Sequence, residues 1–272
     1  MIKFDIRDLV TRNRPAKGTE VIFDPVFGTL RAKNQYRKAA RAFLNGAAKS
    51  YRESVLPALK FYREYATDAE VDTFDEEAWF IGFEVQLDQL ESEFSATIAT
   101  VLTLEAETHT AAWSRVAKRA LGVDLGAVVR NEDLGDYLRD AATRNAGLIK
   151  SLRGDVTDDV RRLVLDAKIN GTSIKQLTAQ IQKRFKVALT RAKLIAEDQT
   201  NKLTSDLNRI RQTQAGVKSY HWQTSGNERV RPLHNAINGL LYRWGQRTGA
   251  EGGLPPGQPI RCRCSARAVV VF

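Results

Sequence analysis

Apolar residues recur every three or four positions between residues 75 and 113, which is the period of one face of an amphipathic helix. The members of this stripe are Phe80, Phe83, Leu87, Leu90, Phe94, Ile98, Val101 and Leu102. Gly82 is the helix breaker inside the pattern. A long helix with so narrow an apolar stripe predicts an elongated helical body rather than a compact enzyme core.

The stretches on either side of this stripe also carry helical patterns. Residues 31–66 are rich in Lys, Arg, Ala and Gln, which form helices readily, and Pro57 is expected to end or kink that helix. Ser173 followed by Gln176 is typical of a capping box at a helix start. Further helices are expected over residues 156–169, from Ser173 onward, and from Thr190 to about residue 215.

The first thirty residues show no sustained period. They contain two prolines and two glycines between Pro15 and Gly28. Such a segment stays loose unless it docks on another surface. Residues 1–30 therefore predict an extended arm that becomes ordered only on a partner.

Beyond Gly216 the pattern changes from helical to alternating. Residues 217–224 place Tyr220 and Trp222 on one side, as expected for a strand that packs one face. Residues 239–259 are rich in Gly and Pro and predict loops, whereas the β-branched run 266–272 predicts a terminal strand.

These patterns predict a mainly α fold, with an elongated helical N-terminal body and a small α+β C-terminal module. Three domains are expected along the chain. The first is the arm at 1–30, and the second is a helical body at 31–145 with basic and then acidic blocks. The third is a C-terminal domain at 146–272, with helices to about residue 215 and a β and loop module at 217–272.

Charge is distributed unevenly along the 272 residues, whose formal net charge is +10. Residues 25–52 hold seven basic side chains and no acidic one, whereas residues 64–114 hold thirteen acidic side chains and no basic one. Two interpretations are open. Both blocks are ordinary solvated helix faces, or the acidic block docks a basic protein and the basic regions contact nucleic acid.

Composition excludes several classes of protein. A hydrophobic fraction of 43% argues against global disorder, and no apolar run reaches the length of a membrane span. The N-terminus lacks the apolar core of a secretory signal, and two cysteines cannot form a disulfide framework, so a reducing compartment is expected. No phosphate-binding loop, dinucleotide fingerprint, nucleophile elbow or metalloprotease motif is present.

An ordered set of short segments in the second half of the chain resembles a known family. The segments begin with residues 191–196, 199–202 and 215–222, and the single positions that follow are Thr224, Arg229, His234, Gly239, Pro255, Pro256, Cys262, Arg263 and Cys264. This order, from a helical pair through a Tyr-x-Trp strand to a closing Cys-Arg-Cys, resembles the Mu F-like minor head proteins of the phage head morphogenesis family. The resemblance covers roughly residues 145–272.

The resemblance implies a structural, non-enzymatic protein without a cofactor. A family member of this kind is a minor capsid protein that associates with the portal and acts in procapsid assembly and in genome packaging or delivery. The implied partner is the portal protein, and the further candidates are the major capsid protein, a scaffolding protein and packaged DNA, but no membrane. The implied location is the capsid interior near the portal vertex, after assembly in the host cytoplasm.

Basic side chains supply the expected contacts to phosphate or to a partner. Lysine and arginine neutralise phosphates without reading the base sequence. The candidates are Arg31, Lys33, Arg37, Lys38, Arg41, Arg243, Arg247 and Arg261.

The sequence departs from the family pattern in its soft metal ligands. Many members carry a Cys-x-x-Cys pair after the Trp strand and a His before the Cys-Arg-Cys. This chain has Arg231, His234 and Gln258 in the corresponding region. His234, Cys262 and Cys264 remain, one fewer than the four protein ligands that a structural zinc usually takes, so free reduced thiols are expected instead of zinc.

Two alternative functions remain open. His221, Thr224, Arg229 and His234 lie close in sequence and could cleave phosphodiesters by acid–base catalysis, as an RNase-like or DNase-like effector delivered with the genome. The other alternative is a packaging factor that binds DNA without sequence preference. Similar sets of residues are common in purely structural folds, so the structural interpretation is favoured.

Overall fold

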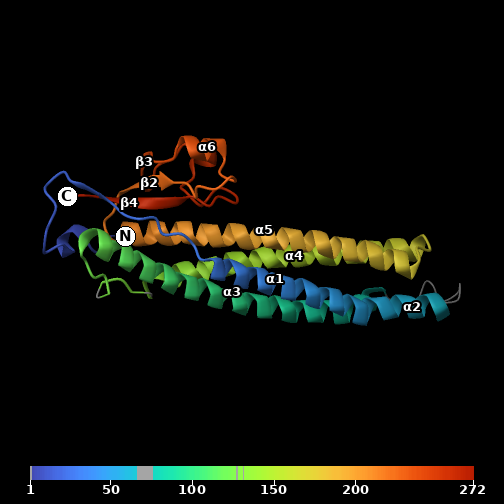
Figure 1. Ribbon diagram of the computed structural model, residues 1–272. Helices are drawn as coiled ribbons and strands as arrows, with labels where there is room; N and C mark the ends of the chain where they lie inside the picture. Colours follow the sequence, from blue (N-terminus) through green and yellow to red (C-terminus); the bar gives the residue numbers. More distant parts are fainter. Residues whose placement is uncertain (1, 66–75, 127, 131) are drawn as a thin grey trace. The chain divides into compact units, whose positions relative to one another are not determined.

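The computed structural model describes residues 2–65, 76–126, 128–130 and 132–272 (Figure 1). The chain forms two compact units. Unit 1 comprises Met1–Lys33, Val101–Ala141 and Glu197–Phe272, and unit 2 comprises Asn34–Thr100 and Ala142–Ala196. These units differ from the three consecutive domains expected from the sequence, because the long helices each contribute residues to both units.

Helices dominate the described residues, and the strands are short. The α-helices are α1 (Leu30–Ser50), α2 (Leu56–Tyr65), α3 (Glu76–Leu121), α4 (Gly135–Ile169), α5 (Ile174–Gln214) and α6 (Pro232–Ala236). The strands are β1 (Glu20–Ile22), β2 (Ser219–Gln223), β3 (Leu241–Arg243) and β4 (Ser265–Val271). A π-helical segment covers Tyr51–Val55, and 3-10 turns cover Ile6–Leu9, Glu132–Leu134 and Glu251–Gly253. The mainly α fold with a small C-terminal sheet is therefore confirmed.

Two expected helix boundaries differ from the structure. Pro57 does not end the helical stretch, but a π-helical segment interrupts the regular α geometry just before it, and Pro57 lies in the first turn of α2, where a missing N–H is tolerated. Thr190 does not begin a new helix within α5. Its hydroxyl donates to the carbonyl of Lys186, one turn earlier, so it is satisfied inside a continuous helix.

In unit 2 the helices lie side by side around an aromatic core (Figure 1). Tyr36 of α1 is buried, its hydroxyl donates to Asn145 Oδ1 of α4 at 2.6 Å, and its ring meets Phe94 edge-on. The apolar stripe of α3 supplies further buried side chains to this core, including Phe83 and Leu87. The capping box at Ser173 is present, since Ser173 Oγ accepts from the backbone N–H of Gln176 at 3.2 Å.

Four acidic side chains of α3 in unit 2 are paired with arginines of α4. Arg153 contacts Asp88 at 2.6 Å and Glu91 at 3.1 Å. Arg161 contacts Glu84 at 2.7 Å and Glu77 at 3.1 Å, and its guanidinium lies 4.5 Å from the centre of the Phe80 ring. The part of the acidic block at 66–75 lies outside the described residues. These four carboxylates are therefore paired within unit 2.

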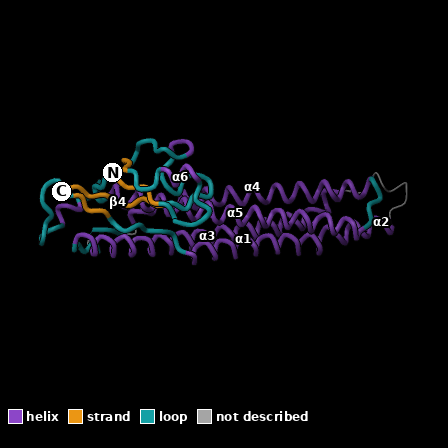
Figure 2. Tube along the Cα trace, turned by 45° about the horizontal axis from the view of Figure 1, so that its top comes forward, coloured by secondary structure: helices purple, strands orange, loops and turns teal. Residues whose placement is uncertain are grey.

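Unit 1 contains an antiparallel sheet with the order β1-β4-β2-β3 among the described residues. Its strands are drawn in orange in Figure 2. Tyr220 on β2 lies opposite Ala268 on β4 and Tyr242 on β3. Tyr220 and Trp222 are both fully buried, as the alternating pattern predicted for one face of a strand. The predicted terminal strand corresponds to β4.

The N-terminal segment packs within unit 1 and does not depend on a separate partner for its order. β1 pairs with β4, and the backbone N–H of Phe23 donates to the carbonyl of Ala268 at 2.9 Å. Ile6 and Phe23 are buried in a core that also contains Trp113 of α3. The expectation of a loose arm is wrong because these apolar residues are spaced irregularly, which leaves no period to detect.

Within the described residues, no helix has both the length and the apolar character needed to cross a membrane.

Candidate functional site

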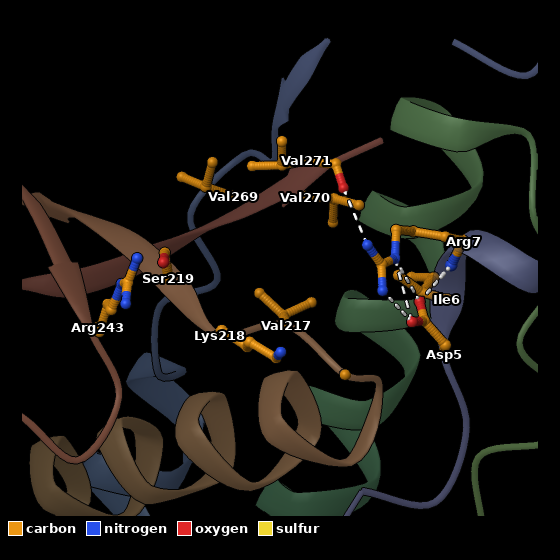
Figure 3. Close-up of a pocket in the computed structure, with 11 residues that line it drawn as sticks. Asp5, Ile6, Arg7, Val217, Lys218, Ser219, Arg243, Val269, Val270 and Val271 are labelled. Carbon is orange, nitrogen blue, oxygen red and sulfur yellow. Dashed lines mark hydrogen bonds and ion pairs between the residues drawn. The ribbon is translucent and has the colours of Figure 1, made fainter. Parts of the chain in front are cut away.

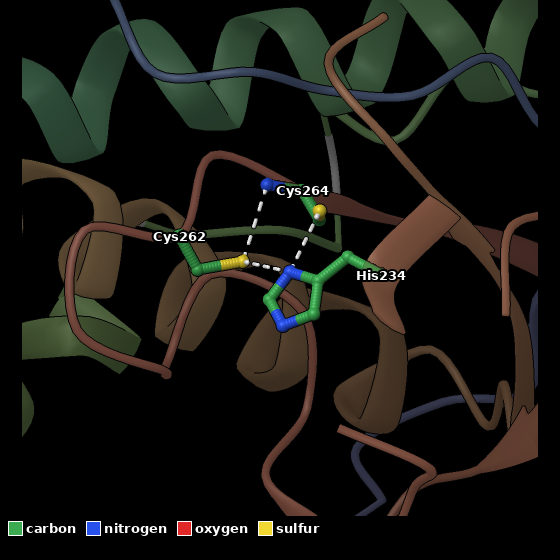
Figure 4. A group of neighbouring side chains, drawn as sticks. All are labelled: His234, Cys262 and Cys264. Atoms are coloured by element: carbon green, nitrogen blue, oxygen red, sulfur yellow. Dashed lines mark hydrogen bonds between the residues drawn. The ribbon is translucent and has the colours of Figure 1, made fainter. Parts of the chain in front are cut away.

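The fold of unit 1 brings one imidazole and two thiols together (Figure 4). His234 lies on α6, whereas Cys262 and Cys264 lie just before β4. His234 Nδ1 is 3.5 Å from Cys262 Sγ and 3.6 Å from Cys264 Sγ, and the three ligand atoms all lie within 4.8 Å of one another. All three residues are buried. We call this group the His-Cys cluster.

The local sequence explains why the two thiols point the same way. Residues two apart in an extended segment project to the same side, and the residue between them projects to the other. Arg263, which lies between them in the sequence, pairs with Glu197 of α5.

The His-Cys cluster is held by packing and by hydrogen bonds. The Trp222 ring meets the His234 ring edge-on, with 5.1 Å between centroids. His234 Nε2 is 2.6 Å from Glu251 Oε2, on the side of the ring that faces away from the thiols. The backbone N–H groups of Gly257 and Cys264 point at Cys262 Sγ, at 3.3 and 3.5 Å. The imidazole and one sulfur are thus fixed in orientation.

The two thiols are inequivalent in acidity. The hydrogen bond from the Cys264 thiol, helped by the two backbone N–H donors, lowers the pKa of Cys262 to about 6 against the opposing effect of burial. The same contact to Cys262, together with burial, raises the pKa of Cys264. The His234 hydrogen bond lowers the pKa of Glu251.

A cavity of about 280 Å³ adjoins the His-Cys cluster and has a strongly basic lining. The lining includes His234, Cys262 and Cys264, and its arginines are Arg229, Arg231, Arg261 and Arg263. Arg229 and Arg261 are exposed at its rim. Arg261 has a φ of 60°, in the left-handed region, and its backbone N–H donates to Asp198 Oδ1 at 2.8 Å. An uncommon backbone conformation thus holds this side chain at the rim.

The other residues of the predicted family motif have structural contacts. Tyr220 packs on Trp244, with 4.2 Å between ring centroids, and the backbone N–H of Thr224 donates to Asn238 Oδ1. Gly239 has a φ of 80° and donates its N–H to the carbonyl of Trp222. Pro255 and Pro256 precede the buried Gly257, and the carbonyl of Pro256 accepts from Ser205 Oγ of α5 at 2.6 Å.

A row of polar residues on α5 was not singled out from the sequence. Ser205, Asn208 and Gln212 are buried and hydrogen-bond to the loop before β4 or to β4 itself. Their spacing of three and four places them on one helix face. This face, rather than the aromatic rings alone, attaches the C-terminal module to α5. The spacing of these three polar residues in the sequence was a signal that could have revealed this helix face.

The residues of the predicted acid–base set are not gathered in one cavity. Arg229 and His234 line the cavity beside the His-Cys cluster, whereas His221 and Thr224 are not among its lining residues. His221 Nδ1 instead contacts the carbonyl of Gly239 at 2.7 Å. The geometry therefore does not assemble the phosphodiester-cleaving set.

A second cavity, of about 290 Å³, lies at one end of the sheet in unit 1 (Figure 3). Its lining includes Lys218 and Arg243, so it brings one predicted contact residue beside another cation. Arg7 also lines it, but its guanidinium is paired with Asp5. The lining of this cavity holds no cysteine or histidine. Among the described residues, the His-Cys cluster therefore offers more side chains that can bind a metal or act as a nucleophile.

The first basic block is divided between the two units. Lys33 lies in unit 1, and its ammonium is 3.7 Å from Glu197. Arg37, Lys38 and Arg41 lie on α1 in unit 2, where Lys38 and Arg41 are exposed. Arg31 is also exposed. The block therefore does not form one continuous surface within either unit.

Comparison with known proteins supports the resemblance in the C-terminal half. Residues 158–267 match the family model described as Phage Mu protein F like protein. A protein of Haemophilus influenzae, described only as uncharacterized, is 34% identical over 148 residues, which is 54% of this chain and 33% of that protein. The chain thus spans about a third of the length of this curated relative. No solved structure matches the chain.

Proposed function

We propose, from the match of residues 158–267 to the Mu F-like family, that this chain acts in phage head morphogenesis as an internal minor capsid protein. The matched region includes all of α5, β2 and β3, and the segments that carry the His-Cys cluster. The protein binds the portal during procapsid assembly and influences genome packaging or delivery. Its proposed place is the capsid interior near the portal vertex, after assembly in the host cytoplasm.

The exposed arginines of unit 1 are the proposed contact surface. Arg243, Arg247 and Arg261 are exposed, whereas Arg231 and Arg263 are paired with Glu251 and Glu197. Exposed arginines bind carboxylates or phosphates in paired geometry and accelerate association with an acidic surface. We therefore place the portal contact on this basic surface and not on the acidic block, four of whose carboxylates pair with Arg153 and Arg161.

Co-purification with the portal protein of the same phage or prophage tests this function. We expect the full chain to elute with the portal ring at low salt and to dissociate as salt rises, since screening weakens exposed charge pairs. The triple variant Arg243→Gln, Arg247→Gln and Arg261→Gln should weaken binding about tenfold, which corresponds to about 1.4 kcal/mol.

A matched control removes the same charge elsewhere. Lys175, Lys183 and Lys186 are exposed on α5 in unit 2, and their replacement by Gln should leave portal binding unchanged. Equal loss of portal binding in both triple variants would mean that the net charge of the chain, and not this particular surface, determines binding. If the chain stays monodisperse and does not bind the portal at low salt, the proposed portal contact is wrong.

Packaged DNA is a second candidate partner, favoured by the same arginines and by the basic cavity. Such contacts neutralise phosphates without reading bases, so affinity should fall steeply with salt and be equal for unrelated duplexes. The arginine triple variant should flatten the salt dependence. Binding that persists at high salt, or that distinguishes sequences, would contradict this candidate.

A further inference from the structure

We propose that His234 Nδ1, Cys262 Sγ and Cys264 Sγ bind a zinc ion. These are soft donors of the types that zinc prefers. They converge from two separate parts of the sequence, α6 and the segment before β4, into a buried position where the three atoms lie within 4.8 Å of one another. This replaces the expectation of free thiols that followed from counting ligands in the sequence.

The distances fit a tetrahedral ion. Zinc binds sulfur at about 2.3 Å and nitrogen at about 2.0–2.1 Å, and tetrahedral angles then separate the two donor atoms by about 3.6 Å. The observed separations from Nδ1 to the two sulfurs are 3.5 and 3.6 Å. Both nitrogen–sulfur separations therefore already fit the coordination of one ion.

The surroundings of the donors are also those of a metal site. A metal-bound histidine usually gives its other ring N–H to a carboxylate, which fixes the ring and leaves the coordinating nitrogen unprotonated. His234 Nε2 has such a partner in Glu251, at 2.6 Å. The backbone N–H groups of Gly257 and Cys264 that point at Cys262 Sγ stabilise a thiolate. Two thiolates neutralise the ion, so it does not repel the nearby arginines.

A catalytic cysteine explains the same residues less completely. A Cys-His-Glu arrangement would use Cys262, His234 and Glu251, but it assigns no task to Cys264, whose sulfur lies equally close to the same imidazole nitrogen. A zinc site uses both sulfurs. Three protein ligands leave a fourth position open for water or an anion, and the arginine-lined cavity adjoins the three donors.

Metal content and cobalt spectroscopy test the proposal on the full chain. The chain is produced without a histidine tag in zinc-supplemented medium, and we expect about one zinc per chain by mass spectrometry of the metal. Replacement by Co²⁺ should give the visible bands of tetrahedral cobalt and a thiolate-to-cobalt charge-transfer band in the near ultraviolet. A chain that carries no zinc and shows no thiolate band with equimolar Co²⁺ would overturn the proposal.

Variants separate the cluster from its neighbours. Cys264→Ser should abolish the charge-transfer contribution of that sulfur and lower zinc content, with folding checked by circular dichroism. Glu251→Gln changes a half-exposed carboxylate outside the ligand set and should weaken zinc affinity about 10- to 100-fold, measured against a chromogenic chelator. His221→Gln, which removes a histidine outside the cluster, should leave zinc content unchanged.

If Cys264→Ser does not fold, Glu251→Gln decides the result. A Glu251→Gln chain that binds zinc as tightly as the unmodified chain, or a His221→Gln chain that loses it, would contradict the assignment of these ligands.

Discussion

Asn208 of α5 faces His109 of α3 inside unit 1, with 3.2 Å between Asn208 Oδ1 and His109 Nε2. The amide Nδ2 of Asn208 donates to the carbonyl of Val26 at 3.0 Å and to Ser265 Oγ at 3.2 Å. Because Oδ1 accepts, Nε2 carries the imidazole proton. His109 Nδ1 is buried and has no hydrogen-bond partner among the described residues. The folded state therefore holds a neutral imidazole, and burial lowers the pKa of His109 to about 4.

This depressed pKa predicts a loss of stability in mild acid. The pKa of a histidine in the unfolded chain is about 6.5. Between pH 6.5 and 4 the unfolded chain therefore binds a proton at His109 that the folded chain does not bind. The contribution is fully present above pH 6.5 and should fall by about 3 kcal/mol as the pH drops to 4. Urea denaturation at several pH values measures it.

The variant His109→Gln supplies the control, because its side chain is neutral throughout this range. Its free energy of unfolding should change less between pH 7 and 4 than that of the unmodified chain. An identical acid dependence in both proteins would show that other groups cause the loss.

Docking of the N-terminal segment predicts a large effect at Phe23. Its side chain is fully buried, and its ring lies 5.2 Å from that of Trp113. Phe23→Ala should lower the free energy of unfolding by about 3–5 kcal/mol, measured by urea denaturation. Phe27 in the same segment is 45% exposed, so Phe27→Ala should cost much less. Similar small effects at both positions would mean that the segment is loose in solution.

The contrast between these two phenylalanines shows where sequence patterns are informative. The stripe of α3 could be predicted because buried residues such as Phe83 and Leu87 recur with the helical period. Phe23 could not be assigned to a core, since its partner strand β4 lies almost at the other end of the chain. Pairing across such a separation leaves no local pattern.

The candidate site was predictable to the same limited extent. Residue type alone marked His234, Cys262 and Cys264 as possible ligands, and the structure places them together. Glu251 and Gly257 could not be recognised, because their contacts with this group depend on the path of the loop before β4. Likewise, the charge blocks were visible in the sequence, but the pairing of their members across helices was not.

The burial of Trp222 predicts that this side chain contributes strongly to the stability of the C-terminal module. The indole is fully buried between β2 and α6, in a small core with Ile237 and Tyr242. Trp222→Ala should lower the free energy of unfolding by about 3–5 kcal/mol, and Trp222→Phe should lower it less because more ring volume remains. Leu241→Ala changes a residue that is 51% exposed on β3 and should stay within about 0.5 kcal/mol. An unchanged melting curve for Trp222→Ala would mean that the ring is not part of a core.

The two adjacent arginines of α4 test whether the acidic block is used within the chain. Arg161 reaches Glu77 and Glu84 on α3 and lies over Phe80, whereas Arg162 pairs with Asp159 and Asp166 of its own helix. The contacts of Arg161 to α3 involve two carboxylates and an aromatic ring. Arg161→Gln should therefore lower the free energy of unfolding by about 1–2 kcal/mol, and by more at low salt than at high salt. Arg162→Gln removes exposed pairs within one helix and should cost about 0.5 kcal/mol or less.

Thermal and urea denaturation of both variants at two salt concentrations measures this difference. If Arg161→Gln proves as mild as Arg162→Gln, the carboxylates of α3 contribute little to folding. The acidic block would then be energetically free to dock a basic partner, as the charge pattern of the sequence alone suggested. A clear difference between the two variants instead assigns these carboxylates to the helical packing of unit 2.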